Sequence, residues 1–227
     1  MRIVPLPPKK KRPKPEFPVM SLDNVMDTIF DKCGNVYIYD RHGTGDNKVI
    51  ILPEPWDELK MMVSYGRRSP MNDLEQKFIG LGHILKDEDE NTIIVVSHFM
   101  QIPTMNRNPV GASNLGPNGE KNPGLDFLEY YYDEYLKNEF RLNTDAYGYQ
   151  VDPFLQKCGA SIFTINGHTH PGLGVFLSST DKISGAACAA TMPICNLVCD
   201  PVRRQILGKI GKGFEDAEII VMSRKEG

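Results

Sequence analysis

The stretch NGHTHPGLGVFLSSTD, Asn166 to Asp181, connects an apolar run to a segment of small residues. Its two histidines, His168 and His170, stand two residues apart. Side chains at i and i+2 point the same way on an extended strand, whereas on a helix they point apart. The spacing therefore predicts two imidazoles side by side at the end of a strand, and paired imidazoles are common metal ligands.

Strand, turn and helix are predicted in succession around this stretch. The run ASIFTINGHTHP has the character of a buried strand, and SSTDKISGAACAATM that of a closely packed helix. Ser178 and Asp181 have the S-x-x-D spacing of a capping box, which by itself explains both as structural residues. The connection is short, however, and should return the start of the helix to the histidines. Two imidazoles and one carboxylate would then meet and leave a fourth position open, which is the ligand count of a catalytic zinc site.

Composition limits the classes of protein that this chain can represent. With 227 residues, 41% of them apolar, it can bury one good-sized core. It has no run of 18 apolar residues and no apolar segment near its amino terminus, so we expect neither a membrane span nor a secretory signal. Five scattered cysteines suit a reducing compartment, and we expect a cytoplasmic protein.

Charge is distributed unevenly along the chain. Residues 1–18 hold six basic residues and one acidic residue, a net charge of +5; the whole chain carries −3, which leaves −8 for the remainder. An acidic body argues against nucleic acid as the main ligand. The proline- and lysine-rich segment 1–18 is predicted to be a flexible tail, and its KKKRPK run is open to three interpretations: a solvated tail, a nuclear-import signal or a contact for polyanions.

The rest of the chain alternates between strand and helix patterns. Residues 19–54 predict a helix, capped by Ser21 and stopped by Gly34, and then a hairpin. Residues 55–227 predict the main domain, which starts with a helix and a second hairpin around the turn KDEDEN. An insert at 106–150 contains a loop and a helix that carries Leu125, Leu128, Tyr132 and Leu136 on one face. This alternation indicates an α/β or α+β domain with a mainly central sheet.

One known family shares this arrangement of residues. HTHPGLGVFLSSTD resembles the H-x-H-P-x6-S-x-x-D signature of the JAMM (MPN+) zinc metallopeptidases, which are deubiquitinase-like isopeptidases, and each fixed position is present. In LEQKFIGLGHI, Glu75 and Gly82 resemble the upstream glutamate of the family and the glycine seven residues after it. Phe78 stands where the family often has glycine, and VCDP, Val198 to Pro201, resembles a downstream strand end of the family.

The resemblance implies a role for each matching residue. His168, His170 and Asp181 would bind Zn²⁺, and a water molecule acidified by the metal would complete the site. Glu75 would act as a partly desolvated general base that passes the proton to the leaving amine. Ser178 would donate a hydrogen bond to the developing oxyanion, a contribution of about 3 kcal/mol by analogy with other oxyanion donors.

The resemblance also implies a fold and a substrate. The fold would be the cytidine-deaminase-like MPN fold, a central mixed sheet flanked by helices. The reaction would be hydrolysis of the amide at the carboxyl terminus of ubiquitin or of a ubiquitin-like protein, bacterial in a prokaryotic-type member. Gly172 and Gly174, together with the insert, are candidate contacts for the tail of the substrate, and the first hairpin, residues 36–52, is the second choice. Relatives that lack the site residues serve as scaffolds, so the alternative is an inactive binding module; the oligomeric state stays open.

Other readings of the metal-binding residue types are weaker. Cys188, Cys195 and Cys199 are spaced unlike any common zinc module, and buried packing is the simpler interpretation. Cysteine catalysis would require a histidine partner, and no motif surrounds the three remaining histidines, His42, His83 and His98. We expect each of these to be structural.

Overall fold

The computed structural model describes residues 16–66, 74–102, 106–108, 111–113, 142–145, 148–151, 162–189 and 192–225. The helices are α1 (Leu22–Cys33), α2 (Pro53–Met62) and α5 (Ser179–Cys188). The strands are β1 (Val36–His42), β2 (Asn47–Ile51), β3 (Lys77–Lys86), β4 (Thr92–Ile102), β5 (Asn106–Asn108), β6 (Gly111–Ser113), β7 (Leu142–Asp145), β8 (Gly148–Val151), β9 (Ile162–Thr169), β10 (Cys195–Asp200), β11 (Gln205–Ile210) and β12 (Glu215–Arg224). None of the described helices is long and apolar enough to cross a membrane.

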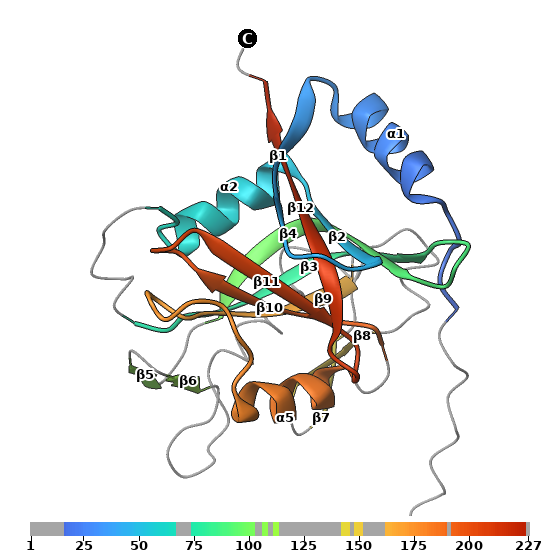
Figure 1. Ribbon diagram of the computed structural model, residues 1–227. Helices are drawn as coiled ribbons and strands as arrows, with labels where there is room; N and C mark the ends of the chain where they lie inside the picture. The colour runs from blue at the N-terminus through green and yellow to red at the C-terminus, as the bar shows by residue number, and fades with distance from the viewer. Residues whose placement is uncertain are drawn as a thin grey trace, which may run out of the picture.

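The main sheet closes on itself as a barrel. Its strand order is β12-β11-β10-β9-β3-β4-β2, and β2 pairs back onto β12, so that seven strands form a ring and β1 is an eighth, added strand (Figure 1). The expected MPN architecture, a central mixed sheet flanked by helices, is therefore wrong for this chain. The pairing that decides this is the parallel register of Ala217–Val221 with Asn47–Ile51, because it uses the edge of β12 that an open sheet would leave free.

β1 and β2 do not form the predicted hairpin. They lie on opposite edges of β12, β1 antiparallel to it and β2 parallel to it. The connecting turn crosses the start of β12 so closely that a Cβ at Gly45 would collide with the backbone of Asp216. Glu218, in the strand between them, accepts from Arg41 Nη1 at 2.7 Å and from Lys48 Nζ at 3.0 Å. Residues 19–54 are thus partly built into the barrel, since β2 is one of its seven strands.

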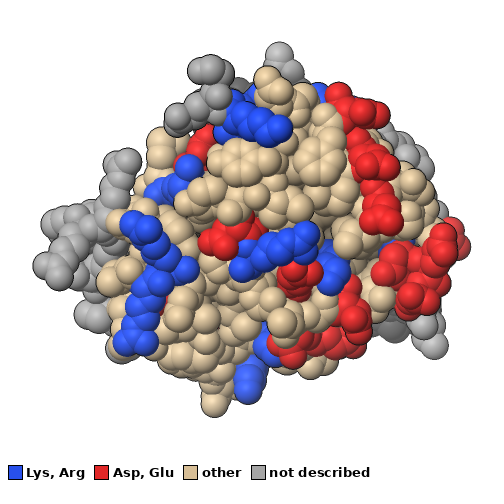
Figure 2. Space-filling model, turned by 45° about the horizontal axis from the view of Figure 1, so that its top comes forward, with Lys and Arg blue, Asp and Glu red and all other residues tan. Residues whose placement is uncertain are grey.

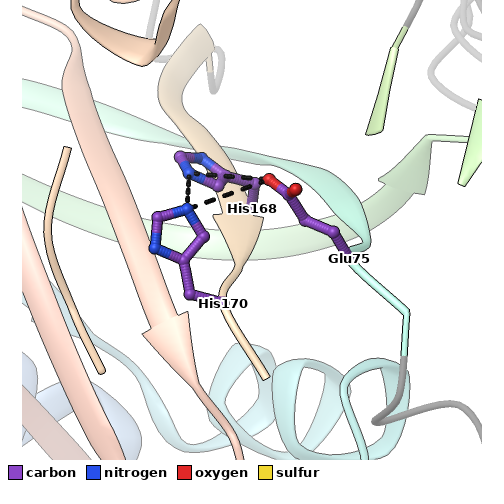
Figure 3. Close-up of side chains that lie close together, drawn as sticks. All are labelled: Glu75, His168 and His170. Atoms are coloured by element: carbon purple, nitrogen blue, oxygen red, sulfur yellow. Dashed lines mark hydrogen bonds and ion pairs between the residues drawn. The ribbon is translucent and has the colours of Figure 1, made fainter. Parts of the chain in front are cut away.

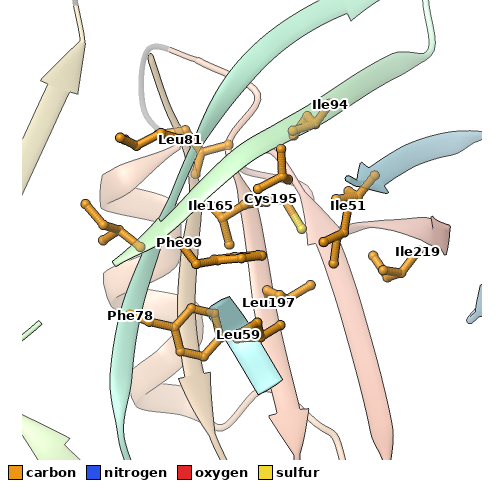
Figure 4. Close-up of a cluster of buried hydrophobic side chains, with 14 of the residues drawn as sticks. Ile51, Leu59, Phe78, Leu81, Ile94, Phe99, Ile165, Cys195, Leu197 and Ile219 are labelled. Atoms are coloured by element: carbon orange, nitrogen blue, oxygen red, sulfur yellow. The ribbon is translucent and has the colours of Figure 1, made fainter. Parts of the chain in front are cut away.

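Side chains on the two faces of the barrel strands supply two cores. Figure 4 shows Ile51, Ile94 and Ile219 turned toward the interior, together with residues of β3, β9 and β10. The intervening residues Ile50, Ile93 and Ile220 point outward and pack against α1. Apolar side chains on both faces explain why these strands are continuous apolar runs rather than alternating ones.

The helices cover separate parts of the barrel. α1 is capped by Ser21, whose side chain accepts from Asn24 N, and is stopped by Gly34, as the sequence predicts. α2 packs against β4 and β12, and its Trp56 and Leu59 are fully buried. α5 lies on the opposite side of the barrel from α1 and α2 (Figure 1). The face in Figure 2 carries its acidic side chains mainly toward one edge and its basic ones elsewhere, so the acidic excess is not spread evenly.

Of the other sequence predictions, one is confirmed and others fall partly outside the described residues. The hairpin around KDEDEN is confirmed: β3 and β4 pair from Lys77↔Ile102 to Lys86↔Thr92. Of the predicted tail, the structure describes only its end, where Phe17 packs against the core and Lys86 N donates to Pro18 O. The insert is described only in two short pairs, β5–β6 and β7–β8. The helix predicted within the insert lies outside the described residues.

Candidate metal centre

β9 positions the two histidines as their spacing predicts. His168 lies in β9, between β3 and β10, and His170 follows directly after the strand end. The N–H of His170 donates to Cys199 O at 2.9 Å, which fixes its backbone against β10. The two Nε2 atoms lie 3.1 Å apart, and each residue is only 6% exposed. Two imidazole nitrogens therefore face the same point.

Glu75 reaches this point from the residue pair just before β3. Thr169, between the two histidines, donates its N–H to Gln76 O and accepts the Gln76 N–H on its hydroxyl oxygen, both at 2.9 Å. This double link holds Glu75 beside the imidazoles. Its Oε1 lies 3.8 Å from His168 Nε2 and 3.9 Å from His170 Nε2, and the residue is 4% exposed (Figure 3). Glu75, His168 and His170 form a buried group that could hold a metal ion.

Asp181 comes to the same point from the first turn of α5. Its Oδ1 lies 3.4 Å from His168 Nε2, and its Oδ2 lies 3.8 Å from His170 Nε2. The capping box is present as well, because Ser178 N donates to Asp181 Oδ2 at 2.8 Å and Asp181 N donates to Ser178 Oγ at 3.2 Å. The two interpretations of this aspartate are compatible: the cap orients the carboxylate toward the histidines.

The distances of the two carboxylates from the imidazole nitrogens can be compared with those of a tetrahedral metal site. A tetrahedral ion with ligand bonds of about 2.1 Å holds its ligand atoms about 3.4 Å apart. The spacing between the two histidines and that between His168 and Asp181 come close to this value, at 3.1 and 3.4 Å. Both distances from Glu75 are longer, at 3.8 and 3.9 Å, and so is that between His170 Nε2 and Asp181 Oδ2, at 3.8 Å. Asp181 thus comes closer than Glu75 to His168, whereas the two carboxylates lie about equally far from His170.

The pKa values of the two carboxylates, Glu75 and Asp181, are shifted in opposite directions. Burial raises the pKa of Glu75; the charge of His168 opposes this shift, and that of Asp181 adds to it. Burial also opposes ionisation of Asp181, but hydrogen bonds and charge from His168 and Ser178 outweigh it and hold the pKa of Asp181 well below its ordinary value. Burial and the neighbouring His168 lower the pKa of His170, which keeps that imidazole neutral and able to bind a cation. Carboxylates whose pKa values are pushed apart are typical of an acid–base pair with divided roles.

Phe78, the departure from the family pattern, has a structural explanation. It pairs with Gly167 across β3 and β9, and its ring occupies the space that a Cβ at Gly167 would need. A large ring on one strand is matched by a glycine on the next, directly before His168.

Asp200 supports the centre, although sequence reasoning gave it no role. It is 0% exposed, and its Oδ1 accepts the N–H groups of Gly172, Val202 and Arg203, each at 3.0 Å. Its Oδ2 accepts from Gly174 N at 2.7 Å. One carboxylate therefore holds both the loop that follows His170 and the turn after β10. The available signal was the VCDP run, an aspartate directly before a proline at a strand end.

The cysteines and the other histidines considered in the sequence analysis are not part of the candidate metal centre. Cys195 and Cys199 are fully buried in the core, and burial raises the pKa of both thiols, that of Cys195 to about 12, so they pack as neutral groups. The side chain of Cys188 lies outside the described residues. His42 pairs with Asp40, and His98 pairs with Glu58.

Comparison with known proteins adds little. No protein-family model matches the chain, and no curated protein matches it. Among solved structures, the chain is similar to the solution structure of protein DSY2949 from Desulfitobacterium hafniense, at 16% identity over 78% of this chain and 95% of that one, with a TM-score of 0.44. Such a distant likeness carries no functional argument, so the functional case depends on the residues of the site.

Proposed function

We propose that this chain is a zinc-dependent isopeptidase of the JAMM (MPN+) type, which hydrolyses the amide at the carboxyl terminus of ubiquitin or of a ubiquitin-like protein. One observation carries the proposal: Glu75 and Asp181, from two other parts of the chain, both place carboxylate oxygens 3.4 to 3.9 Å from the Nε2 atoms of His168 and His170. The proposal comes from the site and not from the fold, because sites of one chemistry occur on unrelated folds.

His168, His170 and Asp181 would hold the metal. The neutral imidazole of His170 and the ionised carboxylate of Asp181 are the protonation states that a cation needs. Zinc supplies, when bound, a Lewis acid that acidifies water and polarises a carbonyl. Zinc suits this nitrogen and oxygen donor set, in which the buried imidazoles outnumber the carboxylate.

Glu75 would move the proton. Its raised pKa makes its carboxylate a stronger base than an exposed glutamate, and its Oε1 lies farther from His168 Nε2 than the Asp181 carboxylate does, at 3.8 against 3.4 Å. The same carboxyl group can then donate that proton to the leaving amine. The Thr169–Gln76 link restricts the direction from which Glu75 approaches.

Ser178 would orient the substrate carbonyl. Its Oγ accepts from Asp181 N, so its hydroxyl proton stays available for donation to a carbonyl oxygen. This role would place an oxyanion donor on the residue that also caps α5, next to the carboxylate that binds the metal.

The test separates metal binding from turnover. Bound zinc per chain is measured by mass spectrometry, and cleavage is measured on a panel of fusions of ubiquitin and ubiquitin-like proteins. Glu75→Gln should keep its zinc and lose about 10²- to 10⁴-fold in rate. Asp181→Asn should lose both zinc and activity. Glu58→Gln is the matched control, because Glu58 also bonds to a barrel strand, at Phe99 N, but lies outside the centre; it should keep both.

Two results would contradict the proposal. If zinc is lost in Glu75→Gln and kept in Asp181→Asn, the two carboxylates have been assigned the wrong roles. A wild-type chain that binds zinc and cleaves none of the fusions would instead be a binding module, the alternative that the sequence leaves open.

A further inference from the structure

The amide side chains of Asn166 and Asn196 form a pair close to the candidate metal centre. The two residues lie opposite each other in the parallel pairing of β9 and β10, and Asn166 Nδ2 donates to Asn196 Oδ1 at 3.0 Å. His168 follows Asn166 by two residues, so its side chain lies on the same face of β9. The amide pair is therefore one step along the sheet from the first imidazole.

Asn196 limits how closely α5 can approach the sheet. Gly185, a buried residue of α5, lies against the amide, and a Cβ at Gly185 would collide with Asn196 Oδ1 and Cγ. Asn196 itself is only 2% exposed. Glycine is unfavourable in the interior of a helix, and here its missing side chain makes room for the amide. The helix thus rests directly on this one side chain.

The contact is connected to the metal centre by one turn of helix. Asp181 precedes Gly185 by four residues, so both lie on the same face of α5. Asp181 Oδ1 now lies 3.4 Å from His168 Nε2. A helix that is pushed outward at Gly185 moves Asp181 away from the imidazole, and metal sites tolerate only small changes in ligand distance.

The amide of Asn196 is present at a cost to stability. Its Nδ2 is buried and has no hydrogen-bond partner in the described part of the chain. A buried donor without a partner destabilises the folded state, and an apolar side chain would avoid this loss. The hydrogen bond from Asn166, however, fixes the orientation of the amide, so that α5 meets a support of defined height.

We propose that Asn196, held by Asn166, is a positioning residue that sets the distance of α5 from β9 and β10 and thereby places the Asp181 carboxylate for metal binding. The amide acts through Asp181. The inference rests on the metal-binding part of the proposed function and does not depend on the reaction that the centre catalyses.

A complementary pair of substitutions tests this role. Gly185→Ala adds a methyl group where the amide stands and should lower zinc affinity about 10- to 100-fold, the range typical of groups that orient metal ligands from outside the coordination shell. Asn196→Ala removes the support and should cause a smaller loss, because α5 can settle toward the sheet. In the double variant the new methyl group takes the place of the amide, and most of the affinity should return. The same methyl group should thus weaken zinc binding when Asn196 is present and strengthen it when Asn196 is absent.

Three measurements on the full chain distinguish positioning from packing. Competition with a chromophoric chelator gives the zinc affinity, and urea unfolding of the metal-free chain gives the stability. The visible absorption of bound Co²⁺ depends on its coordination geometry, so it should change in Gly185→Ala and return in the double variant. Gly208→Ala is the matched control, because its Cβ would collide with Ile219 in the core of the barrel. It should lower stability and leave both metal measurements unchanged.

Each other outcome overturns the inference. A stability loss with wild-type zinc affinity in Gly185→Ala would show that the contact only packs the helix, and a loss of affinity that Asn196→Ala does not reverse would show that the amide is not the support. If Gly185→Ala does not fold, equal zinc affinity in Asn196→Ala and the double variant would refute the role.

Failure of the inference can be told apart from failure of the proposed function. If the affinities follow the expected pattern while no fusion protein is cleaved, the proposed function fails and the positioning role stands. If the fusions are cleaved and Gly185→Ala binds zinc like the wild type, the positioning role fails alone. A wild-type chain that binds neither zinc nor Co²⁺ would overturn both.

Discussion

Asp200→Asn tests how far a buried carboxylate outside the ligand set controls the metal centre. The amide oxygen of asparagine can still accept the three N–H groups that now meet Oδ1, whereas its NH₂ group would face the N–H of Gly174. Two donors cannot bond to each other, so the 2.7 Å contact to Gly174 is lost. The substitution thus removes one of the two bonds to the loop after His170, that of Gly174, and keeps the turn after β10.

The expected size of the effect follows from these contacts. One hydrogen bond to a charged group contributes about 1.5–3 kcal/mol, and the three bonds that remain lose their ionic character, so we expect a stability loss of about 3 kcal/mol. Groups that orient metal ligands from outside the coordination shell typically change affinity by about 10- to 100-fold, and we expect zinc affinity to fall within that range.

Two measurements on one sample check this expectation. Urea unfolding of the metal-free chain gives the stability, and competition with a chromophoric chelator gives the zinc affinity. Asp87→Asn is the matched control: Asp87 also accepts two backbone N–H groups on one oxygen, but it lies half-buried in the β3–β4 turn, outside the metal centre. It should leave the zinc affinity unchanged. Wild-type zinc affinity in Asp200→Asn would refute the reasoning, even if stability fell, because the carboxylate would then hold only the fold.

Two further predictions concern the strand that carries the histidines. Gly167→Ala should destabilise the chain by about 1–3 kcal/mol, because its Cβ would overlap the buried Phe78 ring; an unfolding midpoint like that of the wild type would show that the ring can move aside. In the metal-free chain, the lowered pKa of His170 means that the unfolded state binds the proton first on acidification, so stability should fall as the pH drops below about 6.5. His170→Asn should reduce this fall, and an equal slope in both proteins would contradict the assignment.

Local features of the fold were predictable from the sequence because each depends on neighbouring residues. Ser21 and Gly34 bound α1 as expected, since capping and stopping a helix involve one turn of chain. The β3–β4 hairpin follows from two apolar runs and one turn. The H-x-H spacing and the capping box bring His168, His170 and Asp181 together because strand, loop and helix follow each other within a short stretch.

Features that depend on distant partners were decided only by the tertiary structure. An apolar run such as β2 indicates that both faces of a strand are buried, but it does not identify the strand that pairs with each edge. Closure of the barrel by β2 on β12, and the separation of β1 from β2, depend on which edges remain free after all strands have packed. The same holds at the site: Glu75 and Asp181 are both acids in the sequence, and only their surroundings in the fold raise the pKa of one and lower that of the other. Asp200 gains its role from four N–H groups that the fold gathers from two loops, and the VCDP run marks only the aspartate and not these partners.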